Sequence, residues 1–391
     1  MPIELTLGRP RAERRPAPTL DEAQQSVVDH RGGPLLVLAG PGTGKTTTLV
    51  EAVVDRVQRE ELRPDQILVL TFSRKAAGEI RERISQRLPG TSGTVPAMTF
   101  HSFCYALVRE FSDPEAFEAP PELLTAAARD AVVSELLAGH SAQDWPESIR
   151  QALGTRGFAE ELQSFMAAAA TQGLDPTALA DLAREGGRPE WARVAEAIEE
   201  YHQVIDLENV TDYTDLVTRA AAIAADPSHR RVLRDRFALV VVDEYQDTDP
   251  LQVQLLHDLA GDGRDLIVVG DHDQAIYGFR GADPSAITQF STQFATTSGS
   301  AKLLPAPVLA LTSTRRFGAR ILAAAKVALG NPPVPPGLDR AAIERHRNLE
   351  SLAATDGSVT VATFVSATAE AEHIAAMLRR AHLDDGIAWS Q

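Results

Sequence analysis

The chain has a single cysteine, few aromatic residues and no long apolar run, and each scarcity excludes a class of protein. One cysteine, Cys104, among 391 residues excludes a disulfide framework and fits a reducing compartment, so we expect a cytoplasmic protein. No apolar segment approaches the roughly 20 residues that a membrane span requires, so no membrane partner is expected. Residues 1–18 are rich in Arg and Pro without an apolar core, which predicts a flexible leader rather than a signal peptide.

The chain also lacks an excess of positive charge. It has 38 Lys and Arg against 54 Asp and Glu, for a formal net charge of −16. This balance argues against diffuse binding to nucleic acid. It permits a local basic track, because the field near a groove matters more than the total charge.

What the chain does contain is a phosphate-binding loop near its N-terminus. The apolar run Leu35–Ala39 leads into glycines, and Lys45 and Thr46 then open a helix. Backbone N–H groups in such a loop, with the positive helix end behind them, cradle a triphosphate. Lys45 is expected at the β- and γ-phosphates of ATP and Thr46 at Mg²⁺. The loop residues expected to contact the nucleotide are Gly40, Pro41, Gly42, Thr43, Gly44, Lys45, Thr46 and Thr47.

Short apolar runs recur along the chain and predict the strands of a parallel sheet. Several are continuous Val, Leu and Ile, as expected of strands buried on both faces. Helical patterns separate most of them, so an α/β fold built from βα units is predicted. A polar cluster follows each run, at the sheet edge where such folds bind ligands. The runs are Leu35–Ala39, Ile67–Leu70, Ala97–Phe100, Phe237–Val242, Leu266–Val269 and Val308–Leu311.

The segment 112–206 interrupts this alternation. It is rich in Ala, Leu and Glu, with apolar residues at helical spacing in Leu123–Leu137 and Phe158–Gly173, and predicts a helical insertion domain. Beyond the sheet, Ser358–Phe364 has the pattern of a new strand and Thr368–Ala381 that of a helix.

An acidic pair, Asp243 and Glu244, follows one of the predicted strands. In the same sheet as a phosphate loop, this is the Walker B arrangement. Asp243 is expected to hold Mg²⁺ and Glu244 to polarise the attacking water. A solvated acidic loop is the alternative for the pair taken alone.

The ordered set of motifs resembles the superfamily 1A DNA helicases of the UvrD/Rep type. The set comprises Leu20–Gln24 (Q motif), the phosphate loop (motif I), Thr71–Ile80 (Ia), Thr99–Phe103, Asp243–Asp247 (II), Gly270–Ala282 (III) and Ser313–Arg316 (IV). The resemblance implies a RecA-like P-loop NTPase sheet that uses ATP and Mg²⁺. It also implies a 3′-to-5′ helicase in DNA repair or recombination, with single-stranded or 3′-tailed duplex DNA as partner.

The resemblance assigns roles to further residues. It implies that Gln24 reads adenine, Gln274 orients the γ-phosphate or its water, and Arg316 contacts the γ-phosphate. Arg315 is the alternative to Arg316, because Thr314 and Arg315 replace the family's usual Asn-Tyr pair.

The DNA contacts come from the same resemblance. Tyr277 and Phe279 of motif III are expected to stack on bases, and core packing is the alternative for both. For His101 the alternative to a DNA contact is a side chain whose hydrogen bonds are satisfied within the fold. The implied contacts are Thr71, Phe72, Arg74, Lys75, His101, Tyr277 and Phe279.

The family motor has two RecA-like lobes, and the resemblance divides the chain accordingly. Residues 19–111 and 207–312 form lobe 1A, residues 112–206 the insertion 1B, and residues 313–391 the beginning of lobe 2A. Motifs V and VI are not found, so we expect an incomplete second lobe, in either a fragment or a natural truncation.

A narrower resemblance and a rival function stay open. Phe158–Leu162, Arg188–Trp191 and Arg379–Gly386 resemble actinobacterial helicase–nuclease subunits related to the RecB motor, which implies a second subunit as partner. A non-catalytic module that binds nucleotide and single-stranded DNA is the rival.

Overall fold

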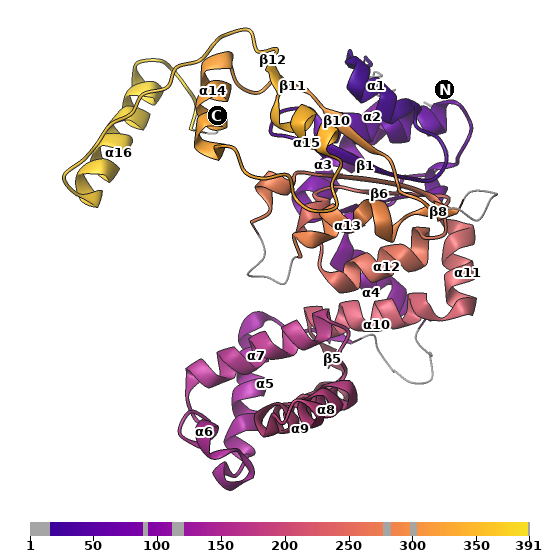
Figure 1. Ribbon diagram of the computed structural model, residues 1–391, viewed down its shortest axis with the longest axis vertical. Helices are drawn as coiled ribbons and strands as arrows, with labels where there is room; N and C mark the ends of the chain where they lie inside the picture. The colour runs from indigo at the N-terminus through magenta and orange to yellow at the C-terminus, as the bar shows by residue number, and fades with distance from the viewer. Residues whose placement is uncertain (1–15, 89–92, 112–120, 277–282, 298–302, 390–391) are drawn as a thin grey trace, which may run out of the picture.

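The centre of the molecule is a six-stranded parallel sheet with the order β10–β1–β7–β6–β2–β3 (Figure 1). The structure is a computed structural model that describes residues 16–88, 93–111, 121–276, 283–297 and 303–389. Each of the six predicted apolar runs supplies one strand of this sheet, although Phe100 belongs to the following helix and Phe237 precedes its strand. This confirms the α/β class. The strands are β1 (Pro34–Ala39), β2 (Ile67–Thr71), β3 (Ala97–Thr99), β6 (Leu239–Val242), β7 (Asp265–Gly270) and β10 (Val308–Leu311).

Successive strand side chains alternate between two cores, one on each face of the sheet. Leu36 and Leu38 pack into one core, and Leu35 and Val37 into the other. This two-sided burial explains why the runs are continuously apolar. One face is covered by α1 (Glu22–Asp29), α2 (Lys45–Gln58) and α3 (Arg74–Arg87), and the other by α4 (Phe100–Phe111), α10 (Tyr213–Ala225), α12 (Pro250–Ala260) and α13 (Ser285–Gln293) (Figure 1).

The register brings the carboxyl ends of the strands to one edge. Ala39 pairs with Leu311, Leu38 with Gly270 and Val242 with Val268. The loops that follow β1, β6 and β7 are therefore neighbours, although they are far apart in the sequence. This edge positions the candidate site.

A second group of helices leaves the sheet domain between β4 (Glu122–Leu123) and β5 (Val210–Thr211), which pair in parallel. Its core surrounds Trp145 and Tyr201, separately from the sheet cores. Thr125, Thr155 and Asp175 cap the N-termini of three of its helices. The helices are α5 (Ala126–Gly139), α6 (Glu147–Arg150), α7 (Arg156–Thr171), α8 (Pro176–Glu185) and α9 (Pro189–Leu207).

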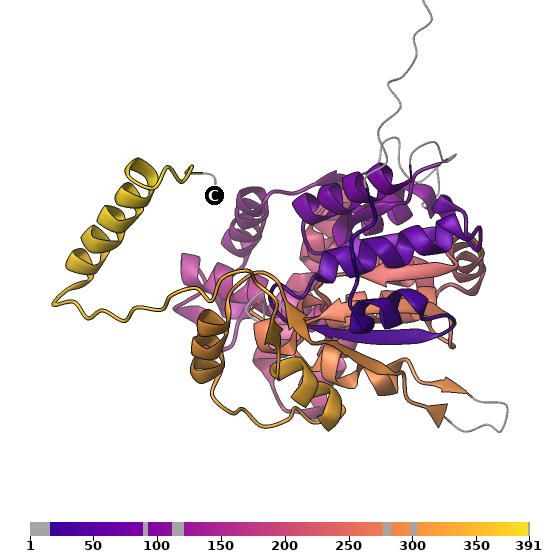
Figure 2. The ribbon, with the colours of Figure 1, turned by 90° about the horizontal axis from the view of Figure 1, so that it is seen from above.

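The C-terminal segment begins with β11 (Ser313–Thr314), which pairs with β12 (Glu350–Ser351). Between them lie α14 (Ala319–Leu329) and α15 (Arg340–Arg347), and α16 (Ala367–Leu383) follows. Seen from above, α16 stands away from the sheet (Figure 2).

The predicted strand Ser358–Phe364 is wrong, because these residues have no regular secondary structure and are exposed. An apolar pattern makes a strand only when another strand accepts its backbone hydrogen bonds, and within the described residues none pairs with it. The predicted helix Thr368–Ala381 lies within α16 and is confirmed.

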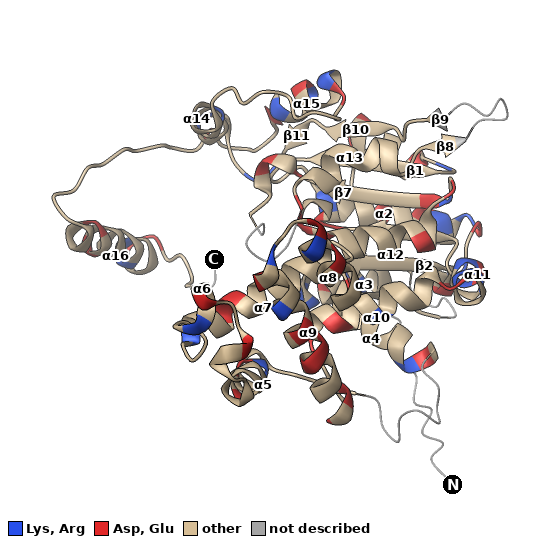
Figure 3. Ribbon diagram, turned by 60° about the horizontal axis from the view of Figure 1, so that its bottom comes forward, with Lys and Arg blue, Asp and Glu red and all other residues tan. Residues whose placement is uncertain are grey.

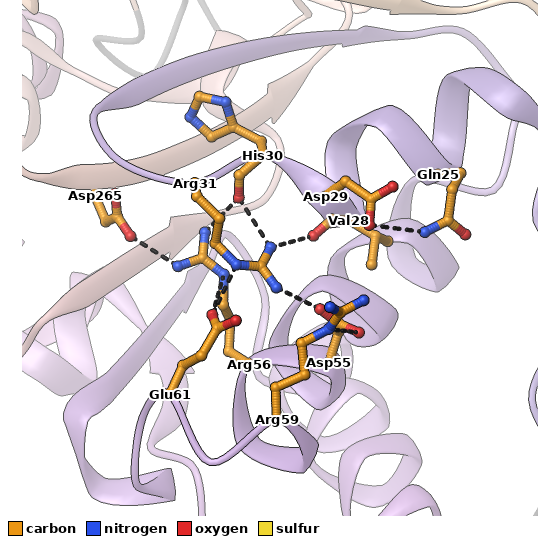
Figure 4. A network of polar contacts seen from close by, with 10 residues as sticks. All are labelled: Gln25, Val28, Asp29, His30, Arg31, Asp55, Arg56, Arg59, Glu61 and Asp265. Carbon is orange, nitrogen blue, oxygen red and sulfur yellow. Dashed lines mark hydrogen bonds and ion pairs between the residues drawn. The ribbon is translucent and has the colours of Figure 1, made fainter.

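An ion-pair network closes the opposite edge of the sheet, where the strands begin (Figure 4). Arg56 of α2 donates to Asp265 at 2.8 Å and to the His30 carbonyl. Arg31 bonds to the Val28 carbonyl. The network thereby ties α1, α2 and β7 together.

In the part of the chain that the structure describes, no helix combines the length and the apolarity needed to cross a membrane.

Candidate functional site

The phosphate loop has the backbone geometry that its glycines permit. Gly42 and Gly44 have φ angles of 73° and 85°. Residues that carry a Cβ adopt such positive φ angles only at a cost in conformational energy. The Thr43 hydroxyl donates to the Gly40 carbonyl at 2.8 Å. Helix α2 starts at Lys45, so its first N–H groups face the loop, as phosphate binding requires.

Gln24 supports this loop from α1. Its Nε2 donates to the Thr43 carbonyl at 2.9 Å, and its Oε1 accepts from the Asp21 N–H at 3.1 Å. The side chain is buried. The structure thus shows Gln24 bonded to the phosphate loop, while its reading of adenine stays a prediction.

The acidic pair meets the phosphate loop. Lys45 Nζ lies 2.9 Å from Glu244 Oε2. Glu244 has a left-handed backbone, with φ 55° and ψ 47°, a strained conformation that clusters at functional sites. Burial, and then the neighbouring Glu244 charge, raise the pKa of Asp243 to about 6. A positive ion would relieve both effects.

Gln246 joins the acidic pair to the turn after β7, although no role for it was predicted from the sequence. Its Nε2 donates to Glu244 Oε2 at 2.9 Å, and its Oε1 accepts from the Asp271 N–H at 3.0 Å. A Cβ on Gly270 would lie 2.8 Å from this Oε1. Only a residue without a Cβ lets Gln246 lie this close to the end of β7, so Gly270 is the feature of the sequence that indicates this contact.

Motif III enters the site through a short 3₁₀ turn, His272–Gln274. Gln274 Nε2 donates to the carboxylate of Asp271. The side chain of Gln274 is therefore held at the site by its hydrogen bond to the buried carboxylate of Asp271. Tyr277 and Phe279 lie outside the described residues.

Motif IV packs directly on the phosphate loop. Thr314 Oγ1 donates to the Pro41 carbonyl at 2.9 Å, and the Arg315 N–H donates to the Gly42 carbonyl at 3.0 Å. The Arg315 guanidinium pairs with Asp21. Arg316 is exposed, and its Cβ would be 2.3 Å from a Cβ on Gly42. This placement favours Arg316 for a contact with phosphate.

A groove of about 1480 Å³ separates the sheet domain from the helical group. Phe72 and Arg74 reach it from motif Ia, and His101 from α4. Burial lowers the pKa of His101, which favours its neutral form. Thr71 is buried and donates to the Ser73 carbonyl, whereas Lys75 is exposed on α3 without lining the groove.

Tyr213 also lines the groove, and the sequence alone did not identify it as a DNA contact. Its ring meets His101 edge to face, with centroids 4.9 Å apart, and is 45% exposed. Asp212 caps α10 and holds Tyr213 in the first turn. Figure 3 shows Asp and Glu gathered on α9, a helix that contributes no residue to the lining of this groove.

Comparisons with known proteins agree with this geometry. The family model described as "UvrD/REP helicase N-terminal domain" matches residues 20–295. The ATP-dependent DNA helicase UvrD2 of Mycobacterium tuberculosis is 33% identical over 288 residues, which cover 70% of this chain and 39% of that protein. The ATP-dependent DNA helicase PcrA of Staphylococcus aureus is 29% identical over 277 residues, covering 70% of this chain and 36% of that protein. The matched region thus spans less than half the length of these relatives.

Proposed function

This chain belongs to the UvrD/REP helicase family, and from this premise we propose that it carries the nucleotide-binding face of an ATP-dependent DNA motor. The proposed activity is 3′-to-5′ translocation on single-stranded DNA, with unwinding of 3′-tailed duplexes in cytoplasmic DNA repair or recombination. Residues 19–111 and 207–312 would form motor lobe 1A, residues 112–206 the insertion 1B, and residues 313–391 part of lobe 2A.

One observation carries the proposal: the ends of β1, β6 and β7 deliver Lys45, Glu244 and Gln274 to a single polar network. Phosphoryl transfer depends mainly on positioning and on charge stabilisation. Lys45 would neutralise the β- and γ-phosphates, Glu244 would accept the proton of the attacking water, and Gln274 would orient the γ-phosphate.

The residues present fit a magnesium ion. Thr46 supplies a hydroxyl oxygen and Asp243 a carboxylate oxygen, the hard ligands that Mg²⁺ prefers. The raised pKa of Asp243, caused first by burial, is what a carboxylate awaiting a cation would show. Bound there, Mg²⁺ would neutralise charge on the transferred phosphoryl group.

The groove supports DNA as the partner. Arg74 would supply positive charge for a phosphate, and the partly exposed rings of Phe72 and Tyr213 suit base stacking. Neither contact reads base edges, so binding is expected to be indifferent to sequence. A second subunit of a helicase–nuclease complex is the other partner class proposed.

The test is phosphate release by the intact protein with and without single-stranded DNA, together with binding of a non-hydrolysable ATP analogue. Lys45→Ala should abolish analogue binding or nearly so, because it removes the charge at the phosphates. Strand displacement on 3′- and 5′-tailed duplexes then gives the polarity. DNA-stimulated turnover supports the motor. Analogue and DNA binding without turnover would support the rival, a non-catalytic binding module.

A further inference from the structure

Helix α15 reaches the candidate site from outside all the motifs named so far. It packs beside β10 and β1. His346 is 4% exposed, and its Nε2 lies 3.0 Å from Asp271 Oδ1. On its other side, the His346 Cε1 lies 3.6 Å from the position of a Cβ on Gly40. The imidazole is therefore wedged between the phosphate loop and the motif III turn.

Asp271 is the centre of these contacts. Its Oδ1 also accepts from the Asp273 N–H at 3.0 Å, its other oxygen accepts from Gln274, and its own N–H donates to Gln246. Burial acts to raise the pKa of Asp271, but the hydrogen bonds from His346 and Gln274 outweigh it, and the pKa is lowered. Asp271 is thus held as an acceptor for Gln274.

Arg347 adds a second anchor to the same turn. Its guanidinium takes both oxygens of Asp273, with Nε to Oδ2 and Nη2 to Oδ1 each at 2.8 Å. Its Nη1 donates to the Pro332 carbonyl at 2.9 Å. A bidentate pair fixes orientation as well as distance.

The same cluster offers oxygen and nitrogen atoms for a cation, since donor atoms of Asp271, Asp273 and His346 lie within 4.8 Å of one another. The hydrogen bonds decide against that use. Arg347 already occupies both oxygens of Asp273, and Gln274 and His346 occupy those of Asp271. A cation would have to displace a part-buried, bidentate guanidinium contact.

We infer that His346 and Arg347 are positioning residues for ATP hydrolysis: through Asp271 and Asp273 they hold the motif III turn so that Gln274 faces the γ-phosphate. This inference rests on the proposed function. It makes α15 a clamp, because one helix contacts both the phosphate loop and the turn that carries Gln274. Binding of the nucleotide itself is expected to depend on Lys45 and the loop backbone, whereas the hydrogen bonds of His346 and Arg347 go to Asp271, Asp273 and the Pro332 carbonyl.

The test separates turnover from nucleotide affinity in the intact protein. His346→Ala should lower kcat for DNA-stimulated ATP hydrolysis about tenfold, because a misplaced orienting group costs rate rather than binding. Affinity for a non-hydrolysable ATP analogue should stay within twofold. His346→Gln, whose amide can still donate to Asp271, should restore most of kcat. Arg345→Ala is the matched control, since Arg345 is the exposed neighbour on the same helix.

A double-mutant cycle then asks whether His346 acts through Gln274. If it does, His346→Ala should add almost nothing to the loss in kcat caused by Gln274→Ala. Additive losses, an unchanged kcat in His346→Ala, or a loss that Gln fails to rescue would each overturn the inference. Thermal melting of every variant identifies a loss that merely reports unfolding, which would also count against it.

Glu244→Gln in the same assay separates this inference from the function on which it rests. If Glu244→Gln abolishes turnover while His346→Ala does not change it, the motor stands and the clamp is wrong. If Glu244→Gln leaves turnover intact, the proposed function fails, and the positioning role fails with it.

Discussion

Nζ of Lys45 lies 2.9 Å from Oε2 of Glu244, so the cation expected at the phosphates is paired with the carboxylate expected to activate water. A bound triphosphate would compete with Glu244 for the same ammonium group. The two groups belong to motifs 199 residues apart in the chain. Their pairing would couple nucleotide binding to the position of the proposed catalytic base.

Glu244→Gln should therefore have opposite effects on binding and on turnover. The amide cannot accept a proton from water, so hydrolysis should be lost. Lys45 is released from a charged partner, so affinity for a non-hydrolysable ATP analogue should rise a few-fold. Calorimetric titration and phosphate release measure the two effects. Weaker binding in this variant would show that the ion pair organises the loop instead of competing with nucleotide.

Asp243→Asn should stabilise the protein in the absence of nucleotide at pH 7.5. Burial raises the pKa of Asp243 from 3.8 to about 6. Between these values the folded state binds a proton that the unfolded state has lost, so stability falls as pH rises through this window. The full penalty, up to about 3 kcal/mol, is present above pH 6 and absent below pH 4.

Urea unfolding of Asp243→Asn at pH 5 and pH 7.5 measures this penalty. The variant's advantage should be larger at pH 7.5, while its binding of the Mg²⁺–nucleotide complex should be lost. Asp235→Asn, at an exposed position, is the control and should show no such trend. An advantage that does not change with pH would contradict the raised pKa.

Gly42→Ala should damage the site, whereas Gly78→Ala should stabilise the protein. Gly42 has a φ of 73°, and its new Cβ would lie 2.3 Å from Arg316 Cβ and 2.6 Å from Thr314 Oγ1. Gly78 lies within α3 with nothing within 4 Å of its Cβ position, so alanine there should add about 0.5–1 kcal/mol through helix propensity. Analogue binding and melting temperature distinguish the two variants. Normal nucleotide binding by Gly42→Ala would mean that motif IV is not tightly packed on the loop.

Tyr213→Ala and Lys75→Ala should weaken binding of single-stranded DNA in different ways. Tyr213 is an exposed ring in the groove, and losing one stacked base costs on the order of tenfold in affinity without changing the salt dependence. If Lys75 contacts a phosphate, Lys75→Ala should reduce the magnitude of the slope of log K against log salt by about 0.7. Fluorescence anisotropy over a salt series separates the two. An unchanged affinity in Tyr213→Ala would place the DNA outside this groove.

Asp265→Ala should destabilise the sheet edge far from the nucleotide. It removes the nearer carboxylate partner of the Arg56 guanidinium, whose side chain is 5% exposed, and leaves only Glu61, whose Oε2 lies 3.8 Å from Arg56 Nε. Breaking a buried pair in this way costs about 3 kcal/mol. Chemical unfolding of Asp265→Ala beside Glu160→Ala, which breaks an exposed pair with Arg156, measures the difference. Equal midpoints would show that Glu61 replaces the lost partner.

The sequence by itself determined the six core strands and the phosphate loop, because both signals are local. A strand buried on both faces needs a continuous apolar run, and Gly42 and Gly44 are required by their own φ angles. The acidic pair was found in the same way, as polar residues at a strand end, whereas the role of Gln274 came from the family resemblance.

Only the tertiary structure decided which of these residues meet. Strand order and register set the Lys45–Glu244 pair and the Gln246 network, and neither can be inferred from spacing along the chain. His346 gains its place from helix packing, and no local pattern marks it. Tyr213 lies in the segment Asp212–Leu216, which resembles a short family motif with a positioning role, but its place in the groove follows from helix packing. The failed strand at Ser358–Phe364 has the same physical cause: its apolar pattern is local, but a strand is stable only with a partner for its backbone.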